Sequence, residues 1–251
     1  MRWASASTIG TSHIDSGSEL QDAYCVRQED STCFAIVSDG AGSAKFGRYG
    51  AWLTCRSLSV QIREHAKVQL ALPDDATISL WIEELRDRIR DIAKARSTTS
   101  RQFAATLTVV IYNENDLLAF QIGDSASAIR CEGKWSCLIW PESGEYASTT
   151  YFVTDEPVVR LQTIRQAKDF DGLALFSDGV GELALSYVEE GVFAGFLDPM
   201  IKPVAQSIDR GKLKMLSGQL KTFLSSESVC ERTDDDKTLV LIVPDAVQST
   251  A

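Results

Sequence analysis

The order of elements in this sequence predicts an α+β fold with antiparallel sheets. Three β-rich segments come first, a pair of amphipathic helices follows, strands then return, and a helix precedes the last strand. Strands that are grouped in this way, apart from the helices, are typical of antiparallel sheets. A doubly wound parallel sheet would require a more regular alternation of strands and helices.

The first three strands are expected within the first 40 residues. Their segments are "WASASTI" (residues 3–9), "DAYCVR" (22–27) and "CFAIVS" (33–38). Each segment is rich in small apolar, β-branched or aromatic residues, and polar or glycine-containing segments separate them. This pattern is typical of short strands joined by turns.

The helix pair is predicted from apolar periodicity in residues 48–65 and 77–95. Apolar side chains return every three or four positions, as they do on one face of a helix. The stripes are formed by Ala51, Cys55, Leu58 and Ile62 in the first helix and by Ile78, Ile82, Leu85, Ile89 and Ile92 in the second. Charged residues occupy the other face of the second helix, which is therefore expected to bury one side only.

The second half of the chain is predicted to be mostly strands, with helix near its end. The expected elements are strands at 104–113, 117–131 and 172–179, loops with a few strands at 135–166, a helical stretch from about 200 to 225, and a last strand at 237–244. The sequence contains no internal repeat and no linker rich in Pro, Gly or Ser. Residues 1–251 are therefore predicted to form a single domain.

Composition excludes several classes of partner and site. The net charge is -10 and there is no basic cluster, which argues against nucleic-acid and anionic-membrane partners. Residues 1–13 lack the apolar core of a signal peptide, and no apolar run is long enough to span a bilayer, so we expect a cytoplasmic protein. The five tryptophans are interpreted as packing residues.

The residue types that remain for chemistry are mainly carboxylates. The six cysteines form no CxxC pair and are expected to be reduced thiols that fill the core. With only His13 and His65, the chain offers little material for a zinc site or a Ser-His-Asp triad. Any reaction must therefore depend on aspartate and glutamate side chains.

Aspartates recur where apolar strands begin or end. They are Asp39 after "AIVS", Asp124 after "LLAFQIG", Asp178 after "LALFS", and Asp234, Asp235 and Asp236 before "KTLVLIV". Each of them alone is explained equally well by a turn, because Asp and Gly favour turns. Together they predict a convergent acidic cluster, and such a cluster requires cations because neighbouring anions repel one another.

Oxygen ligands without Cys or His favour Mg²⁺ or Mn²⁺ over zinc. A pair of such ions, bridged by a carboxylate, lowers the pKa of a water molecule and holds a phosphoryl group for in-line attack. In this interpretation Asp39 bridges the two ions, and the backbone carbonyl of Gly40 reaches one of them.

The same residues resemble a known family. In chain order, "LQDAY", "VSDGAGS", "ATLTVV", "QIGDSAS", "FSDGVGE" and "DDDKTLV" resemble the motifs of the metal-dependent type-2C (PPM) protein phosphatases. "GTSHI", "GEYASTTYFVTDEP" and "ERTDDDKT" resemble a compact bacterial subgroup. The resemblance covers nearly the whole chain and implies a central antiparallel β-sandwich flanked by helix pairs. It also implies hydrolysis of phosphoserine and phosphothreonine in proteins by a metal-bound water, with Mn²⁺ or Mg²⁺ and without a phosphoenzyme.

The resemblance assigns roles to individual residues. It implies that Asp39 bridges two catalytic metals and that Gly40 contributes its carbonyl oxygen. Asp178 matches the second direct metal ligand and Asp235 the third, although Asp234 or Asp236 could take that place. The other matches are Asp22, for the acidic residue that holds metal-bound waters, and Asp124, for the position linked to a weaker third metal.

Four departures from the family pattern affect the expected site. Gln21 stands where the family usually has Glu. The usual phosphate-binding arginine is not evident, and its place falls on His13 if the following "DSGSEL" is an insertion; a loop histidine without phosphate contact is the alternative. Ala41 stands where some members carry a histidine proposed as general acid. The segment after "GDSAS" is shorter than the usual flap.

The predicted function is that of a phosphoprotein Ser/Thr phosphatase that acts on a phosphoprotein substrate, as a monomer. A cognate Ser/Thr kinase is expected as a partner by analogy alone. The alternative is a pseudophosphatase that keeps the fold and binds a phosphoprotein without turning it over, which Gln21 and the missing arginine favour. An aspartyl-phosphate mechanism of the haloacid dehalogenase type is rejected, because no second Asp follows Asp39 two positions later.

Overall fold

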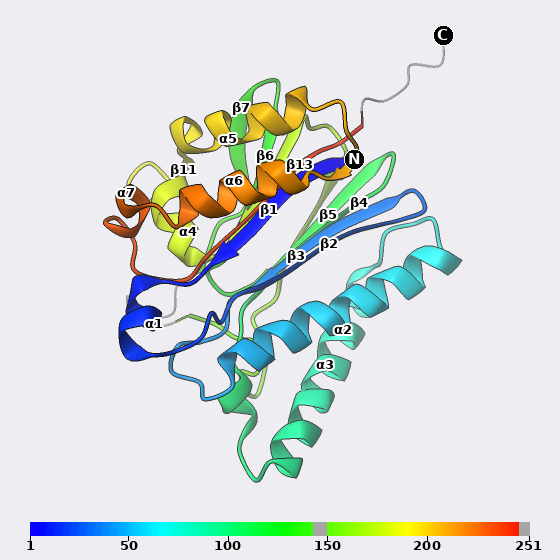
Figure 1. Cartoon of the computed structure of the whole chain (residues 1–251). Helices are drawn as coiled ribbons and strands as arrows, with labels where there is room; N and C mark the ends of the chain where they lie inside the picture. Colours follow the sequence, from blue (N-terminus) through cyan, green and yellow to red (C-terminus); the bar gives the residue numbers. More distant parts are fainter. Residues whose placement is uncertain (143–149, 246–251) are drawn as a thin grey trace.

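The computed structural model describes residues 1–142 and 150–245 and shows two stacked β-sheets between layers of helices (Figure 1). One sheet has the order β12 (Gly211–Lys212), β1 (Arg2–Thr8), β13 (Lys237–Val243), β9 (Gly172–Phe176), β6 (Ala126–Cys131) and β7 (Lys134–Ile139). The other has the order β2 (Ala23–Glu29), β3 (Thr32–Ser38), β4 (Leu107–Tyr112), β5 (Asp116–Ile122) and β8 (Gln162–Ala167). Every pairing within these sheets is antiparallel except that of β1 with β12. The predicted α+β sandwich is confirmed.

The predicted helix pair covers the second sheet (Figure 1). It consists of α2 (Gly47–Val68) and α3 (Asp75–Ala95), each extending slightly beyond the predicted range. The side chain of Asp74 begins α3 by accepting a hydrogen bond from the Thr77 backbone N–H at 2.8 Å. The predicted stripes are buried against the sheet, apart from Ile92, which is half-buried. Apolar burial of this stripe stabilises the pair.

The other helix layer differs from the prediction of one helix at 200–225. It contains α5 (Ala194–Gln206) and α6 (Lys214–Leu224), and the short edge strand β12 lies between them. The first helix ends at Gln206, after which Ser207 has extended backbone, and Gly211, with a φ of +76°, begins β12. The first sheet is therefore covered by α5 and α6 instead of by one long helix.

The predicted strand at 117–131 is also two strands, and they lie in different sheets. The break is at Gly123, where φ is +99° and a Cβ would lie 2.6 Å from the Tyr151 carbonyl oxygen. Because only glycine fits there, the chain turns from β5 into β6 and leaves Asp124 at the corner. The continuous apolar pattern gave no sign of this sheet change.

Several short elements were not predicted. Two of them follow strand ends near the acidic residues: α1 (Thr11–Ser16) after β1 and α4 (Asp178–Ala184) after β9. The others are η1 (Ser100–Phe103), the hairpin of β10 (Leu185–Ser186) and β11 (Gly191–Val192), and α7 (Glu227–Cys230). Within the described residues, no helix is both long and apolar enough to cross a membrane.

The strand directions bring distant segments to one end of the sandwich. Thr8 at the end of β1 pairs with Lys237 at the start of β13, and Leu239 of β13 pairs with Phe176 at the end of β9. In the second sheet, Ala23 at the start of β2 pairs with Ser38 at the end of β3. The aspartates that flank these strand ends are therefore held close together.

Candidate active site

Three of the predicted aspartates form what we call the open group: Asp39, Asp124 and Asp178. One carboxylate oxygen of each lies within 4.8 Å of those of the other two. Asp39 follows β3, Asp124 lies at the corner between β5 and β6, and Asp178 is the first residue of α4. The sequence places them 54 or more positions apart, and the register described above brings them together.

The open group is electrostatically unfavourable when it is empty of cations. Burial, followed by repulsion from Asp178, Asp22 and Asp235, raises the pKa of Asp39 well above its usual value. Burial and then the charges of Asp124 and Asp235 do the same to the pKa of Asp178. The pKa of Asp124 is raised mainly by burial. Carboxylates at this spacing ionise together only if a cation offsets their charge.

Asp22 lies against the open group. It is 8% exposed and accepts a hydrogen bond from the Ser177 hydroxyl at 2.7 Å. Burial raises the pKa of Asp22 to about 6. Oδ1 of Asp22 and Oδ1 of Asp124 are buried and have no hydrogen-bond partner among the described residues. Two buried acceptors therefore remain for a ligand.

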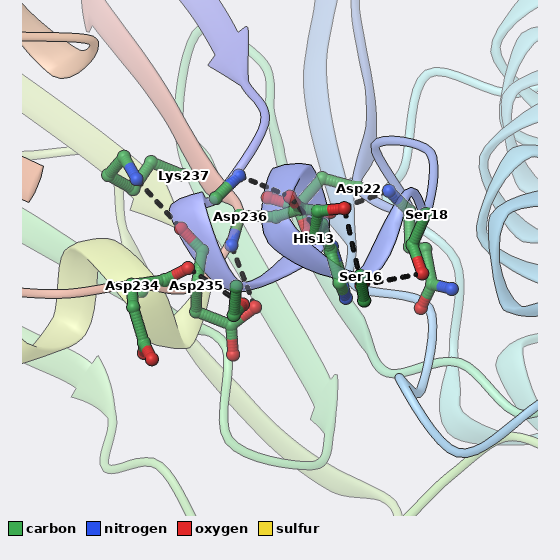
Figure 2. Close-up of polar contacts among 12 residues, drawn as sticks. His13, Ser16, Ser18, Asp22, Asp234, Asp235, Asp236 and Lys237 are labelled. Carbon is green, nitrogen blue, oxygen red and sulfur yellow. Dashed lines mark hydrogen bonds and ion pairs between the residues drawn. The ribbon is translucent and has the colours of Figure 1, made fainter.

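His13, Asp235 and Asp236 form a second set, which we call the anchored group (Figure 2). Asp236 is 1% exposed and accepts hydrogen bonds from the backbone N–H groups of Gly10 at 2.7 Å and Gln21 at 2.6 Å. Nδ1 of His13 lies 3.0 Å from the same carboxylate. These contacts join the segment after β1 to the start of β13. The Asp236 side chain therefore stabilises the fold at this end of the sandwich.

The structure separates the three members of the acidic triplet. Asp234 is exposed, Asp236 is buried in the contacts just described, and Asp235 is half-buried. The charge of Asp235 contributes to the raised pKa of Asp39, of Asp124 and of Asp178, so it lies near the whole open group. Of the three, only Asp235 has a charge that acts on every member of the open group, and its role as a metal ligand stays a prediction.

Gly10 allows the close contact between the two chain segments in the anchored group. A Cβ at this position would overlap the carbonyl oxygen of Asp234 and the carbonyl carbon of Asp235. Ser12 then donates hydrogen bonds to the Asp234 carbonyl oxygen from its backbone N–H at 3.0 Å and from its hydroxyl at 2.8 Å. Any larger residue at position 10 would push α1 away from the triplet.

Gln21 connects the two groups. Its backbone N–H donates to Asp236, and its side-chain amide, assigned the orientation in which the nitrogen faces carbonyl oxygens, lies 2.7 Å from that of Gly40 and 3.2 Å from that of Ala41. The Gly40 carbonyl, predicted as a metal ligand, therefore already accepts one hydrogen bond. A carbonyl oxygen has two lone pairs, so one remains for a cation. The neutral amide thus has a structural partner that a carboxylate at position 21 could not bind.

His13 is oriented rather than free in a loop. Its side chain is 15% exposed, and Nε2 lies 3.8 Å from where a Cβ of Gly42 would stand. The ring therefore lies between the acidic triplet and the turn that carries Asp39 and Gly40. This position is compatible with the predicted phosphate contact.

Two residues of the site were missed by the sequence reasoning. Lys237 is completely buried, and its Nζ donates a hydrogen bond to the Asp235 carbonyl oxygen at 2.8 Å (Figure 2). The sequence feature that could have identified it is a lysine at the first position of an otherwise apolar strand. For Ser177, whose hydroxyl donates a hydrogen bond to Asp22, the only such feature is its position directly before Asp178. Residues 144–149 of the segment "GEYASTTYFVTDEP" lie outside the described residues.

The arrangement fits hard divalent cations. It offers carboxylate and carbonyl oxygens, buried acceptors without partners, and carboxyl groups whose pKa values are raised by burial and by one another's charge. These are the ligands and the charge that Mg²⁺ and Mn²⁺ prefer.

Comparison with known proteins agrees with the site and the fold. The family described as protein phosphatase 2C matches residues 9–225. Serine/threonine-protein phosphatase 3 of Escherichia coli K12 is 33% identical over 243 residues, which cover 94% of this chain and 95% of that protein.

Solved structures share the fold at low sequence identity. The catalytic domain of serine threonine protein phosphatase PstP, solved with two manganese ions, has a TM-score of 0.66 and 15% identity, with 96% of each chain covered. Serine/threonine phosphatase Stp1 from Staphylococcus aureus has a TM-score of 0.65 and 13% identity, with 97% of this chain and 95% of that chain covered. With its family match, its relative and its carboxylate site in agreement, the chain belongs to the protein phosphatase 2C family.

Proposed function

We propose that this protein phosphatase hydrolyses phosphoserine and phosphothreonine in proteins and that it requires two divalent cations, Mn²⁺ or Mg²⁺. The observation that supports this most directly is the open group, whose half-buried carboxylates repel one another and include an acceptor without a partner. Membership of the protein phosphatase 2C family supports the reaction class. The name of the E. coli relative supports the choice of serine and threonine.

In this proposal Asp39, Asp178, Asp235 and the Gly40 carbonyl oxygen would hold the two ions, with Asp39 shared between them. Asp22 would accept hydrogen bonds from water at the site, and Asp124 would contribute to a weaker third site. When they are bound, such ions supply a water of lowered pKa and offset the negative charge that develops on the phosphoryl oxygens.

The residues of the chain position these ligands. Ser177 fixes one oxygen of Asp22 at 2.7 Å, which leaves Oδ1 for solvent or a ligand. Lys237 holds the Asp235 carbonyl oxygen at 2.8 Å and so limits the orientation of that residue. His13, held by Asp236, presents Nε2 for a hydrogen bond to a substrate phosphoryl oxygen. This contact is weaker and more pH-dependent than an arginine would provide.

The pseudophosphatase alternative lacks a supporting observation. Gln21, which motivated it, occupies a defined position and leaves a lone pair of the Gly40 carbonyl available. Asp39, Asp178 and Asp235 are all retained and converge. We propose further that the chain acts as one domain on phosphoprotein substrates produced by a Ser/Thr kinase.

The test is hydrolysis of a phosphothreonine peptide by purified protein with Mn²⁺, with Mg²⁺ and with excess chelator. Asp39→Asn is compared with Asp116→Asn, a matched control at the exposed start of β5 on the opposite end of the sandwich. We expect metal-dependent turnover that only the first change abolishes. Absence of turnover from folded protein with either metal would contradict the proposal and favour a phosphoprotein-binding module.

A further inference from the structure

A short hairpin beside the open group exposes large apolar side chains. It consists of β10 and β11 and follows α4 directly (Figure 1). In its connecting turn Tyr187 is 52% exposed and Val188 is 96% exposed. Apolar side chains concentrated beside a charged site are a feature of ligand- and protein-binding surfaces.

The Tyr187 side chain is directed back toward α4. Its hydroxyl oxygen lies 3.4 Å from the position that a Cβ of Gly181 would occupy, one turn after Asp178. Burial and the charges of Asp178, Asp124 and Glu182 raise the pKa of Tyr187 to about 12, which agrees with a hydroxyl that faces the open group. The hydroxyl therefore faces α4 one turn after Asp178, and about half of the side chain is open to solvent.

Trp140 packs against Tyr187 and extends this surface toward the Asp124 corner. Its ring meets that of Tyr187 edge to face, with centroids 5.8 Å apart and an interplanar angle of 77°. The Glu142 backbone N–H donates a hydrogen bond to the Gly123 carbonyl oxygen at 3.3 Å, which places this segment beside the Asp124 corner. Trp140 and Tyr187, which we call the aromatic rim, thus link the segments that carry Asp124 and Asp178.

We propose that the aromatic rim binds an apolar side chain next to the phosphorylated residue of a protein substrate and so determines sequence preference. This inference rests on the proposed function, because a phosphoryl group bound at the open group brings the flanking residues of its chain over the adjacent surface. Aromatic rings give a large contact area at a low cost in conformational entropy. The Tyr187 hydroxyl can also donate a hydrogen bond to the substrate backbone.

Charge determines which flanking residues are disfavoured. The turn of the hairpin also carries Glu189 and Glu190, and the whole chain has a net charge of -10. Like charges that face one another across an interface oppose association. The rim therefore favours apolar over acidic residues beside the phosphorylated position.

The experiment compares phosphothreonine peptides that differ only in the residue after phosphothreonine: Leu, Gly or Glu. N-acetyl phosphothreonine methylamide serves as a fourth substrate, with the same leaving group and no flanking side chain. For the unmodified protein with Mn²⁺, we expect kcat/KM to be about tenfold higher for the Leu than for the Glu peptide, as for about 1.4 kcal/mol of contact. Tyr187→Ala should reduce the ratio of kcat/KM for the Leu peptide to that for the Gly peptide at least fivefold, through a higher KM for the Leu peptide. Tyr187→Phe should retain most of this ratio.

Ile208→Ala, which removes a side chain that is 96% exposed at the far edge of the first sheet, is the matched control and should leave all ratios unchanged. An unaltered ratio of Leu to Gly peptide in Tyr187→Ala would overturn the role of the rim while leaving the proposed function intact. Failure to hydrolyse even the blocked phosphothreonine would instead overturn the proposed function, and the rim proposal with it.

Discussion

The open group and the anchored group lie at the same end of the sandwich, but their carboxylates are stabilised in different ways. Asp236 of the anchored group accepts two backbone N–H groups and faces an imidazole. Asp39 and Asp178 of the open group face other carboxylates, and their pKa values are raised. The protein itself stabilises the first group, whereas the second requires a cation. Changes that neutralise the two groups should therefore affect stability in opposite directions.

The largest expected effect is that of Asp39→Asn on activity. Loss of the bridging carboxylate should lower kcat/KM about 10³-fold or more, since metal ions supply several kcal/mol of charge stabilisation. In chelator the same change should raise the unfolding midpoint in urea, because it removes a repelling charge. A variant that loses both activity and metal-free stability would show that Asp39 is a structural residue like Asp236.

Asp236→Ala tests the opposite side of the comparison. Its removal leaves two buried N–H groups and the His13 ring without an acceptor, so we expect a loss of about 4 kcal/mol in the free energy of unfolding. Urea denaturation in chelator measures it. Asp234→Ala, at an exposed neighbouring position, is the control and should cost less than about 0.5 kcal/mol. Equal effects of the two changes would mean that Asp236 is not the anchor.

Without metal, the pH dependence of stability should reveal the cost of ionising Asp22 beside the open group. Asp22 has a pKa raised from 3.8 to about 6 in the folded protein, so the folded state binds its proton more tightly than the unfolded state. The stability it contributes is present below about pH 4 and is lost as the pH rises through 6, about 3 kcal/mol in total. Unfolding in chelator between pH 4 and 7 should show this fall, relative to Asp22→Asn. If the stability of the unmodified protein minus that of Asp22→Asn rose with pH instead, a raised pKa of Asp22 would be contradicted.

Gln21→Glu has the smallest expected effect and probes the link between the groups. The amide hydrogen bond to the Gly40 carbonyl would be replaced by a carboxylate facing that oxygen. We expect a loss of about 1 kcal/mol in chelator and a smaller loss with Mn²⁺ present. Thermal unfolding with and without Mn²⁺ gives the comparison. A stabilised metal-free variant would mean that Gln21 does not hold that carbonyl.

Element order and apolar periodicity predicted the α+β class and the helix pair, and the family resemblance predicted the sandwich. The prediction failed where the backbone changes direction within an apolar pattern. Gly123 turns the chain from one sheet into the other through a positive φ, which composition alone does not reveal. The helical stretch near the end of the chain is divided because α5 ends in extended backbone at Ser207.

For the candidate site, the sequence allowed us to predict which strand ends come together. Asp39, Asp124 and Asp178 converge as expected, because strand ends in paired strands share an edge. The separate use of Asp235 and Asp236 could not be predicted, since adjacent residues of the same type differ only in the direction of their side chains. Lys237 was missed because a buried lysine is rare and its partner is a backbone carbonyl.

The pairing of β1 with β13 has a consequence for how the protein is made. His13 and Asp22 leave the ribosome early, but Asp236, to which their segment is attached, is more than 200 residues away. At about 5–20 residues per second, the first strand waits roughly 10–50 s for its neighbour. The acidic end of the sandwich therefore cannot assemble before Asp236 has been synthesised, and the nascent chain stays inactive until then.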